Sequence, residues 1–152
     1  MAATPMEVFQ FGQLEIRFLI DGTVGGMADA GSVSMFEFDV APGAKVPVAH
    51  SHDAYEETLY GLEGVLTLTV GGQRTELGPG DVLLIPRGAV HRFDNLHAAA
   101  TRTLAVITPG ILGVAYFRDI AAVVKASAGG PPDAKAIGEV MRRHGLTPAP
   151  QG

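Results

Sequence analysis

Short stretches in which apolar and polar residues alternate dominate the first two thirds of the chain. The two clearest cover residues 14–20 and 32–40. Alternation with a period of two is typical of a half-buried strand, because successive side chains point to opposite faces. The positions predicted to share the buried faces are Leu14, Ile16, Phe18 and Ile20 in the first stretch and Ser34, Phe36, Phe38 and Val40 in the second.

Turn signals separate these stretches from several others of similar length. A glycine-rich loop is predicted over 22–31, and Gly71-Gly72 favours a two-residue hairpin turn. The further extended stretches are 46–52, 57–62, 65–70, 73–77, 82–85, 89–93 and 101–108. About nine short strands with turns between them indicate an all-β sandwich or barrel.

The spacing of apolar residues becomes helical after Pro109. It predicts a helix over 112–126 and a second helix that starts after Pro131-Pro132-Asp133 and stops at Gly145. Residues 148–152 are expected to be a frayed end. We therefore divide the chain into a β-barrel over 1–110 and a C-terminal helical extension over 111–152. The extension is too short for a core of its own, so it must pack on the barrel or on a second subunit.

Composition and charge exclude several classes of protein. The 152 residues carry 16 acidic and 11 basic side chains, a net charge of −5, whereas binding to nucleic acid or to an anionic membrane requires a basic surface. The chain has no cysteine, so any metal must be bound by His, carboxylate or backbone oxygen. Residues 1–10 lack the features of a signal peptide, and the most apolar stretch, 104–117, is too short to span a bilayer. A cytoplasmic location is expected.

Three of the five histidines lie in a pattern that suits a metal ion. His50 and His52 are two positions apart on an extended stretch, so their side chains point to the same side. Glu57 follows five residues later, and the closing of a barrel would bring His91 to them. Three imidazoles and one carboxylate suit Fe, Mn, Ni, Co or Zn. With four protein ligands, an octahedral ion keeps two positions for water, substrate or dioxygen.

The sequence around these residues resembles the two motifs of the cupin superfamily. In the first motif, Gly43 is followed by His50-x-His52, by Glu57 and, after six residues, by Gly64. The interval from Gly43 to His50 is one residue longer than the pattern. The second motif is matched at every spacing by Gly80, Pro86, Gly88, His91 and Asn95. The tail, with Ala115-Tyr116-Phe117-Arg118, looks like that of small bacterial cupins described as quercetinase-like.

The resemblance implies a small single-domain cupin with a double-stranded β-helix, or jelly-roll, barrel. Such cupins commonly occur as dimers, so it also implies a homodimer. It further implies one divalent transition metal on His50, His52, Glu57 and His91. The six residues before Gly64 select Glu57 rather than Glu56 as the carboxylate ligand. Glu57 is also the candidate catalytic base.

Other residues near the motifs have structural interpretations. Those assigned to turns, backbone bonding or the surface are Gly64, Gly80, Pro86, Gly88, Asn95, Glu56, Arg87 and Arg92. His97 and His144 are not expected to be ligands, and His144 suits the C-terminal end of a helix. The large apolar side chains assigned to the core, with one or two of them lining a pocket, are Phe36, Phe38, Leu66, Phe93, Tyr116 and Phe117.

The function favoured by these features is that of a metal-dependent oxidoreductase of the dioxygenase type, acting on a small organic substrate in the barrel. Two alternatives stay open. The same site suits a Lewis-acid isomerase, decarboxylase or lyase. It also suits a non-catalytic cupin that binds a metal or small ligand. Neither nucleic acid nor membrane is an expected partner.

Overall fold

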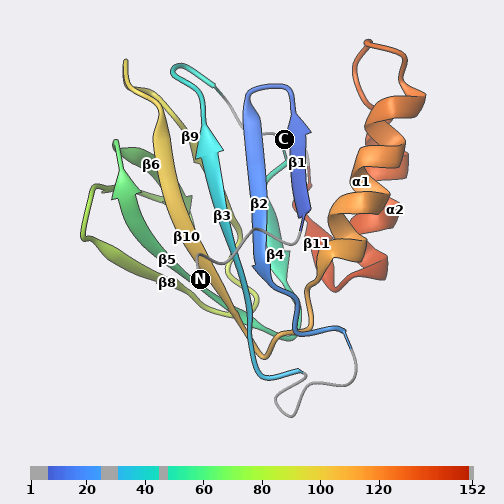
Figure 1. The fold of residues 1–152 in the computed structure, drawn as a ribbon, viewed down its shortest axis with the longest axis horizontal. Coiled ribbons are helices and arrows are strands. Elements are labelled where there is room, and N and C mark those ends of the chain that lie inside the picture. The colour runs from blue at the N-terminus through green and yellow to red at the C-terminus, as the bar shows by residue number, and fades with distance from the viewer. Residues whose placement is uncertain (1–6, 25–30, 45–47, 151–152) are drawn as a thin grey trace.

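A computed structural model describes residues 7–24, 31–44 and 48–150 of the chain. They form two antiparallel sheets and two helices (Figure 1). In order of neighbours, the larger sheet consists of β1 (Glu7–Phe11), β2 (Leu14–Ile20), β3 (Ser34–Val40), β10 (Thr101–Thr108), β5 (Glu56–Glu63) and β8 (Val82–Ile85). The smaller sheet consists of β11 (Leu146–Pro148), β4 (His50–His52), β9 (His91–Asp94), β6 (Leu66–Val70) and β7 (Gln73–Leu77).

The chain crosses between the sheets repeatedly, so that strands distant in sequence become neighbours. The central strand β10 pairs with β3 on one side and with β5 on the other. In the same way β9 lies between β4 and β6. Two antiparallel sheets joined by such crossings form the jelly-roll arrangement. The expected all-β fold with a short helical tail is confirmed.

Burial follows the predicted alternation most clearly in β3 and β10. On β3, Ser34, Phe36, Phe38 and Val40 are buried and the residues between them are half-buried. The core lies between the two sheets, because an alternating strand buries only the face that meets the opposite layer. β2 departs from the prediction at its end. Ile20 is 38% exposed, because the pairing register with β3 shifts between Phe18 and Ile20.

Two predicted segments extend beyond the described residues. Within the predicted loop over 22–31, residues 25–30 lie outside them. In the stretch 46–52, residues 46 and 47 also lie outside, and only His50–His52 form a strand.

The sequence pattern gave no indication of β1. Its single buried side chain, Phe9, packs against Phe117 with ring centroids 5.8 Å apart. Burial of Phe9 therefore depends on a contact with a segment more than a hundred positions away, which local alternation does not reveal.

Helix α1 (Val114–Ala126) starts two residues later than predicted. Its first turn is capped from the loop after β2, where Oδ2 of the buried Asp21 accepts a hydrogen bond from Val114 N at 3.1 Å. Gly113 allows this approach, because a Cβ at that position would lie 2.3 Å from Asp21 Oδ1. Phe117 then packs onto Phe18 and Phe36, so α1 covers the end of the larger sheet's core face.

Helix α2 (Ala134–Arg143) begins as predicted, with Asp133 accepting hydrogen bonds from Lys135 N and Ala136 N. It stops at Gly145, whose φ is 79°. The frayed end expected over 148–152 is wrong at Pro148, which is part of a strand, and at Ala149, whose N–H donates to Ala49 O. Leu146–Pro148 form β11 and pair with β4, and Pro148 is tolerated because β11 is an edge strand. Residues 151 and 152 lie outside the described ranges.

Neither α1 nor α2 has the length and apolar character needed to cross a membrane. The cytoplasmic location and the division of the chain at residue 110 stay predictions.

Candidate metal centre

Both sheets contribute to one group of candidate ligands. His50 and His52 lie on β4 of the smaller sheet, and His50 is paired with His91 on β9. Glu57 lies on β5 of the larger sheet, with its side chain turned inward. The i, i+2 spacing of the strand therefore brings the two imidazoles to one side, as predicted, and the folding of the barrel adds His91 and Glu57.

The three imidazoles form a close cluster. Each offers a ring nitrogen such that all three atoms lie within 4.8 Å of one another. The Nε2 atoms of His50 and His52 are 3.2 Å apart. Glu57 Oε2 lies 3.6 Å from His52 Nε2 and 3.7 Å from His91 Nε2. The carboxylate thus approaches two of the three histidines.

Backbone carbonyls orient two of the rings. His50 Nδ1 lies 3.0 Å from Val48 O, and His91 Nδ1 lies 3.0 Å from Ala89 O. A carbonyl only accepts, so each Nδ1 carries the proton and donates it. The Nε2 atom of each ring is then left with a free lone pair directed into the cluster, which is the tautomer that metal-binding histidines use.

Burial keeps the cluster neutral. It lowers the pKa of His50 to about 4, with repulsion from His91 adding to the effect. It lowers the pKa of His52 to about 2, with further repulsion from His91 and His50. Burial also lowers the pKa of His91. At neutral pH the three rings are therefore uncharged, as metal-binding imidazoles must be. Burial raises the pKa of Glu57 to about 7.

The donor set fits the divalent transition metal that the motifs imply. His91 Nε2 is buried and has no hydrogen-bond partner among the described residues. A buried lone pair without a partner is costly unless a cation meets it, and this one faces the other candidate ligands. Imidazole nitrogens with one carboxylate suit first-row transition metals.

His50, His52 and Glu57 line a cavity of about 710 Å³ between the barrel and the two helices. Its other walls are mainly apolar and come from β2, β3, α1, α2 and the turn between β1 and β2. The aromatic side chains among them are Phe11, Phe36, Phe38, Phe93, Tyr116 and Phe117. More aromatic residues line this pocket than the one or two expected, because α1 adds Tyr116 and Phe117 to the barrel's own side chains.

Two tyrosines accompany the candidate ligands. Tyr55, to which the sequence pattern assigned no role, is fully buried and stacks on His52 with ring centroids 4.5 Å apart. Tyr116 brings a hydroxyl group into the cavity wall from α1. Burial, followed by the nearby Glu57 carboxylate, raises the pKa of Tyr116, so its hydroxyl stays protonated and able to donate.

The remaining polar residues singled out in the sequence lie apart from the cluster. Glu56 forms an exposed ion pair with Arg87, whose Nε is 2.6 Å from Glu56 Oε1. Asn95 is buried and donates from Nδ2 to Val40 O and Ala99 O. This geometry confirms the surface and backbone-bonding roles expected for these three residues.

The other two histidines pair with carboxylates. His97 Nε2 lies 2.9 Å from Glu76 Oε2, and His144 Nε2 lies 2.8 Å from Asp119 Oδ2. Neither belongs to the three-histidine cluster. Arg92 is exposed and lies 3.4 Å from Asp94, yet part of it also lines the cavity.

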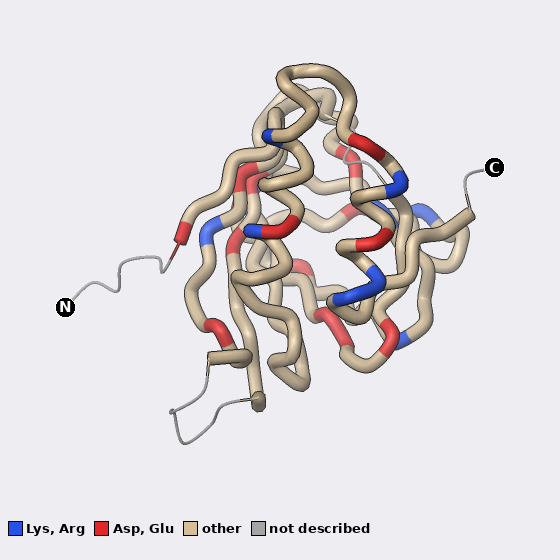
Figure 2. Tube along the Cα trace, turned by 90° about the vertical axis from the view of Figure 1, so that its right-hand side faces the viewer, with Lys and Arg blue, Asp and Glu red and all other residues tan. Residues whose placement is uncertain are grey.

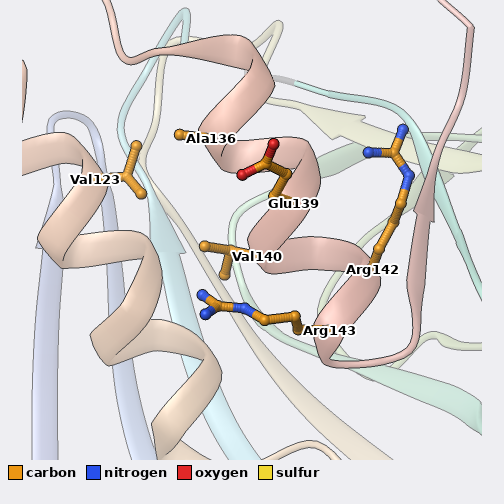
Figure 3. A pocket seen from close by; sticks show the side chains of 6 residues that line it. All are labelled: Val123, Ala136, Glu139, Val140, Arg142 and Arg143. Carbon is orange, nitrogen blue, oxygen red and sulfur yellow. The ribbon is translucent and has the colours of Figure 1, made fainter.

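A second cavity, of about 480 Å³, lies between α1 and α2 (Figure 3). It is lined by Val123, Ala136, Glu139, Val140, Arg142 and Arg143. None of these residues is a candidate ligand, so this cavity is separate from the candidate metal centre.

Comparison with known proteins agrees with the geometry. Residues 36–107 match the family described as "Cupin domain". A "Quercetin 2,3-dioxygenase" of Bacillus subtilis (strain 168) is 39% identical over 64 residues, which cover 42% of this chain and 19% of that protein. The "Tetracenomycin polyketide synthase protein TcmJ" of Streptomyces glaucescens is 31% identical over 84 residues, covering 54% of this chain and 56% of that protein. The chain therefore matches less than two thirds of the length of either relative.

A solved structure shares the fold as well. It is described as a sugar phosphate isomerase from a cupin superfamily, from Silicibacter pomeroyi. It has 28% sequence identity and a TM-score of 0.50, and the match covers 61% of this chain and 59% of that chain.

Proposed function

Because this chain belongs to the cupin superfamily, we propose that it is a metal-dependent enzyme whose site consists of His50, His52, Glu57 and His91. The observation that carries the proposal is the convergence of three neutral imidazoles with a carboxylate beside them, where His50, His52 and Glu57 line one large cavity. The cofactor is one divalent transition metal from the group Fe, Mn, Ni, Co and Zn. When bound, it would supply Lewis acidity toward a substrate oxygen and, for a redox-active ion, a path for electrons to dioxygen.

The preferred reaction class is oxidation of a small organic substrate by dioxygen. The likeness to a quercetin 2,3-dioxygenase supports this class, although the match covers a small part of that protein. The aromatic side chains that line the cavity support a flat and largely apolar substrate, because such walls favour ring stacking and exclude water. Glu57 and Tyr116 both line the cavity, which supports a role for Glu57 in accepting a proton from a substrate hydroxyl and for Tyr116 in donating a hydrogen bond to a substrate oxygen.

The test is a metal analysis of the purified protein combined with a substrate screen. Flavonols, diketones and catechols are incubated with the metal-loaded protein in air and under strictly anaerobic conditions, and substrate loss and oxygen uptake are measured. The proposal expects turnover in air, with oxygen consumed in proportion to substrate, and none under nitrogen. Turnover that continues at an equal rate without oxygen overturns the dioxygenase class.

A Lewis-acid isomerase, decarboxylase or lyase is the second candidate. The structural likeness to a sugar phosphate isomerase favours it. The two candidates differ in their dependence on metal redox chemistry. Full activity with Zn²⁺, which has no accessible second oxidation state, would support the second candidate. Tight ligand binding without any turnover would instead support a non-catalytic binding cupin.

We propose that the partners are a small-molecule substrate and a second copy of the chain. Side chains that point away from the core on β5, β8 and β10 form an outer apolar patch. In register, Tyr60 faces Val82 and Leu104, and Thr58 faces Leu84 and Val106. Val82 is 66% exposed and Leu84 55%, on a strand with no further neighbour among the described strands. A contiguous exposed apolar face is typical of a protein interface.

Charge supports a second copy as the occupant of this outer apolar patch. Arg102 on β10 lies beside the patch and pairs with Asp39 and with Glu63 of β5, so the border of the patch carries both signs of charge. A copy related by a two-fold axis can set each charge against its opposite. Figure 2 shows Lys and Arg spread over the molecule among acidic residues, which supports the proposal that neither nucleic acid nor an anionic membrane is a partner.

A further inference from the structure

The strand that carries two of the candidate ligands is held on its barrel side by one register pair with β9 and by one loop bond, which Gly88 N donates to His52 O at 2.9 Å. β4 has three residues, and its ladder to β9 contains one register pair, His50 with His91. By comparison, β9 makes four register pairs with β6 on its other side. One pair does not hold a strand in place, because each further pair adds hydrogen bonds that limit its twist and slide.

The other edge of β4 is occupied by β11, far along the chain. Leu146 pairs with His52, Thr147 with Ser51 and Pro148 with His50. The ladder continues at both ends, where Asp53 N donates to Gly145 O at 2.8 Å and Ala149 N donates to Ala49 O at 2.8 Å. A side-chain bond adds to it, since Thr147 Oγ1 donates to Asp53 Oδ1 at 2.7 Å. Every position from 49 to 53 thus lies against β11 or its ends.

The pairing of β11 with β4 also affects the orientation of the His50 imidazole. Val48 has a φ of 65°, a left-handed conformation that β-branched residues rarely adopt and that persists only where the surroundings enforce it. The next residue, Ala49, is bonded to Ala149. The carbonyl of Val48 accepts the bond from His50 Nδ1 that leaves Nε2 free for a metal. Anchoring Ala49 therefore helps to hold the carbonyl that orients His50.

β11 also connects the site to the helix above the cavity. Only His144 and Gly145 separate it from α2. Leu146 is buried opposite His52 and lines the cavity together with Ile137 and Met141 of α2. The position of the ligand strand is therefore tied to the packing of α2 over the substrate space.

We propose that β11 is a positioning element for the metal centre: its pairing with β4 aligns His50 and His52, so that metal affinity depends on this strand. This inference rests on the proposed metal site. The residues of β11 are not themselves candidate metal ligands, and they act through His50 and His52.

The test compares proline substitutions at the two edges of the same sheet in the full-length chain. By the alternation of an antiparallel ladder, Thr147 and Ser51 form the hydrogen-bonded pair between the two bonds at the ends of the ladder. Thr147→Pro removes the backbone N–H that Thr147 contributes to this pair, at a position where the side chain is exposed. The matched control is Thr75→Pro on β7, the opposite edge strand, where Thr75 is also exposed. Co²⁺ affinity is measured by calorimetry and by the visible absorption of the bound ion, and folding of the metal-free protein by circular dichroism.

We expect Thr147→Pro to lower Co²⁺ affinity by about tenfold or more and to change the Co²⁺ spectrum, as loss of groups that orient metal-binding histidines does. Thr75→Pro is expected to leave affinity within about twofold of the unmodified chain, since β7 pairs only with β6 among the described strands and not with β4 or β9. An equal loss in both variants, or an unchanged affinity in a folded Thr147→Pro protein, overturns the inference.

A gentler pair keeps the proposal testable if Thr147→Pro does not fold. Thr147→Val removes the side-chain hydrogen bond to Asp53 but keeps a residue that favours strands. Thr147→Ser retains a hydroxyl that can make this bond. Weaker Co²⁺ binding by the valine variant with recovery in the serine variant is the expected result, and equal binding by both contradicts it. Absence of Co²⁺ binding by the unmodified chain overturns the metal site and this inference together. Co²⁺ binding that the substitutions in β11 leave unchanged overturns this inference alone.

Discussion

The ring of Tyr55 stacks on the ring of His52, with centroids 4.5 Å apart and planes inclined by 23°. The tyrosine is fully buried, and its hydroxyl has no hydrogen-bond partner among the described residues. The side chain therefore supports a candidate metal ligand through its face, while its polar tip adds no bond. These two properties of Tyr55 are separable by substitution.

Tyr55→Phe is expected to leave stability unchanged or to raise it by about 1 kcal/mol, because it removes a buried, unsatisfied hydroxyl and keeps the stacked ring. Tyr55→Ala should lower the free energy of unfolding by about 3–5 kcal/mol through the cavity it leaves. Urea denaturation of the metal-free protein measures both effects. Loss of about 2 kcal/mol or more in Tyr55→Phe would mean that the hydroxyl makes a bond that the structure does not show.

The carboxylate ligand is tested by exchanging two adjacent glutamates for glutamine. Glu57 is 7% exposed beside the histidines, whereas Glu56 is paired with Arg87 at the surface. Glu57→Gln should weaken divalent metal binding by roughly tenfold or more, because it removes the anionic donor, and Glu56→Gln should leave it nearly unchanged. Elemental analysis and calorimetric titration measure the change. If Glu56→Gln has the larger effect, the assignment of Glu57 as ligand is wrong.

Four strands, β2, β7, β8 and β10, have the bounds predicted from the sequence, and for β7 and β8 strong local turns explain the agreement. Residues 73–77 and 82–85 form β7 and β8 with the predicted bounds, since Gly71-Gly72 and the turn at 78–81 interrupt the chain on both sides. β1 and β11 were not predicted. A three-residue strand that ends in Pro148 shows no alternation, and its partner β4 lies about a hundred positions away. Pairing over that distance is set by tertiary packing, which local patterns do not encode.

The residues of the candidate site were named from the sequence, but only part of their geometry was predicted. The spacing of His50 and His52 follows directly from strand geometry. Their orientation depends on the carbonyl of Val48 and on β11, and the stacking of Tyr55 depends on where the chain turns after His52. Those contacts arise only when the barrel closes.

We expect the stability of the protein at acid pH to depend on the ionisation of Asp39. Burial alone would raise the pKa of Asp39, but hydrogen bonds from Arg17 and Arg102 outweigh it and hold the pKa below the ordinary value of 3.8. The folded carboxyl therefore ionises more readily than the unfolded one. Its contribution to stability is present above the unfolded pKa and is lost as pH falls through the folded pKa.

We expect Asp39→Asn to be less stable than the unmodified chain near neutral pH, and the difference to shrink as the pH falls below 3.8. Urea denaturation across a pH series measures the free energy of unfolding of both proteins. Two parallel pH profiles would show that the ion pairs of Asp39 with Arg17 and Arg102 contribute nothing to stability.

The proposed homodimer places Val82 and Leu84 of the outer apolar patch in an interface. Leu84→Asp should shift the protein to a monomer, because an interfacial carboxylate would lose its hydration without gaining a partner. Light scattering coupled to size-exclusion chromatography measures the mass, for which one chain contributes 15.8 kDa. Leu96→Asp is the matched control, since Leu96 is 48% exposed, similar to the 55% of Leu84, and lies outside the patch. A monomeric unmodified chain, or a dimer that Leu84→Asp leaves intact, would show that this face is not the interface.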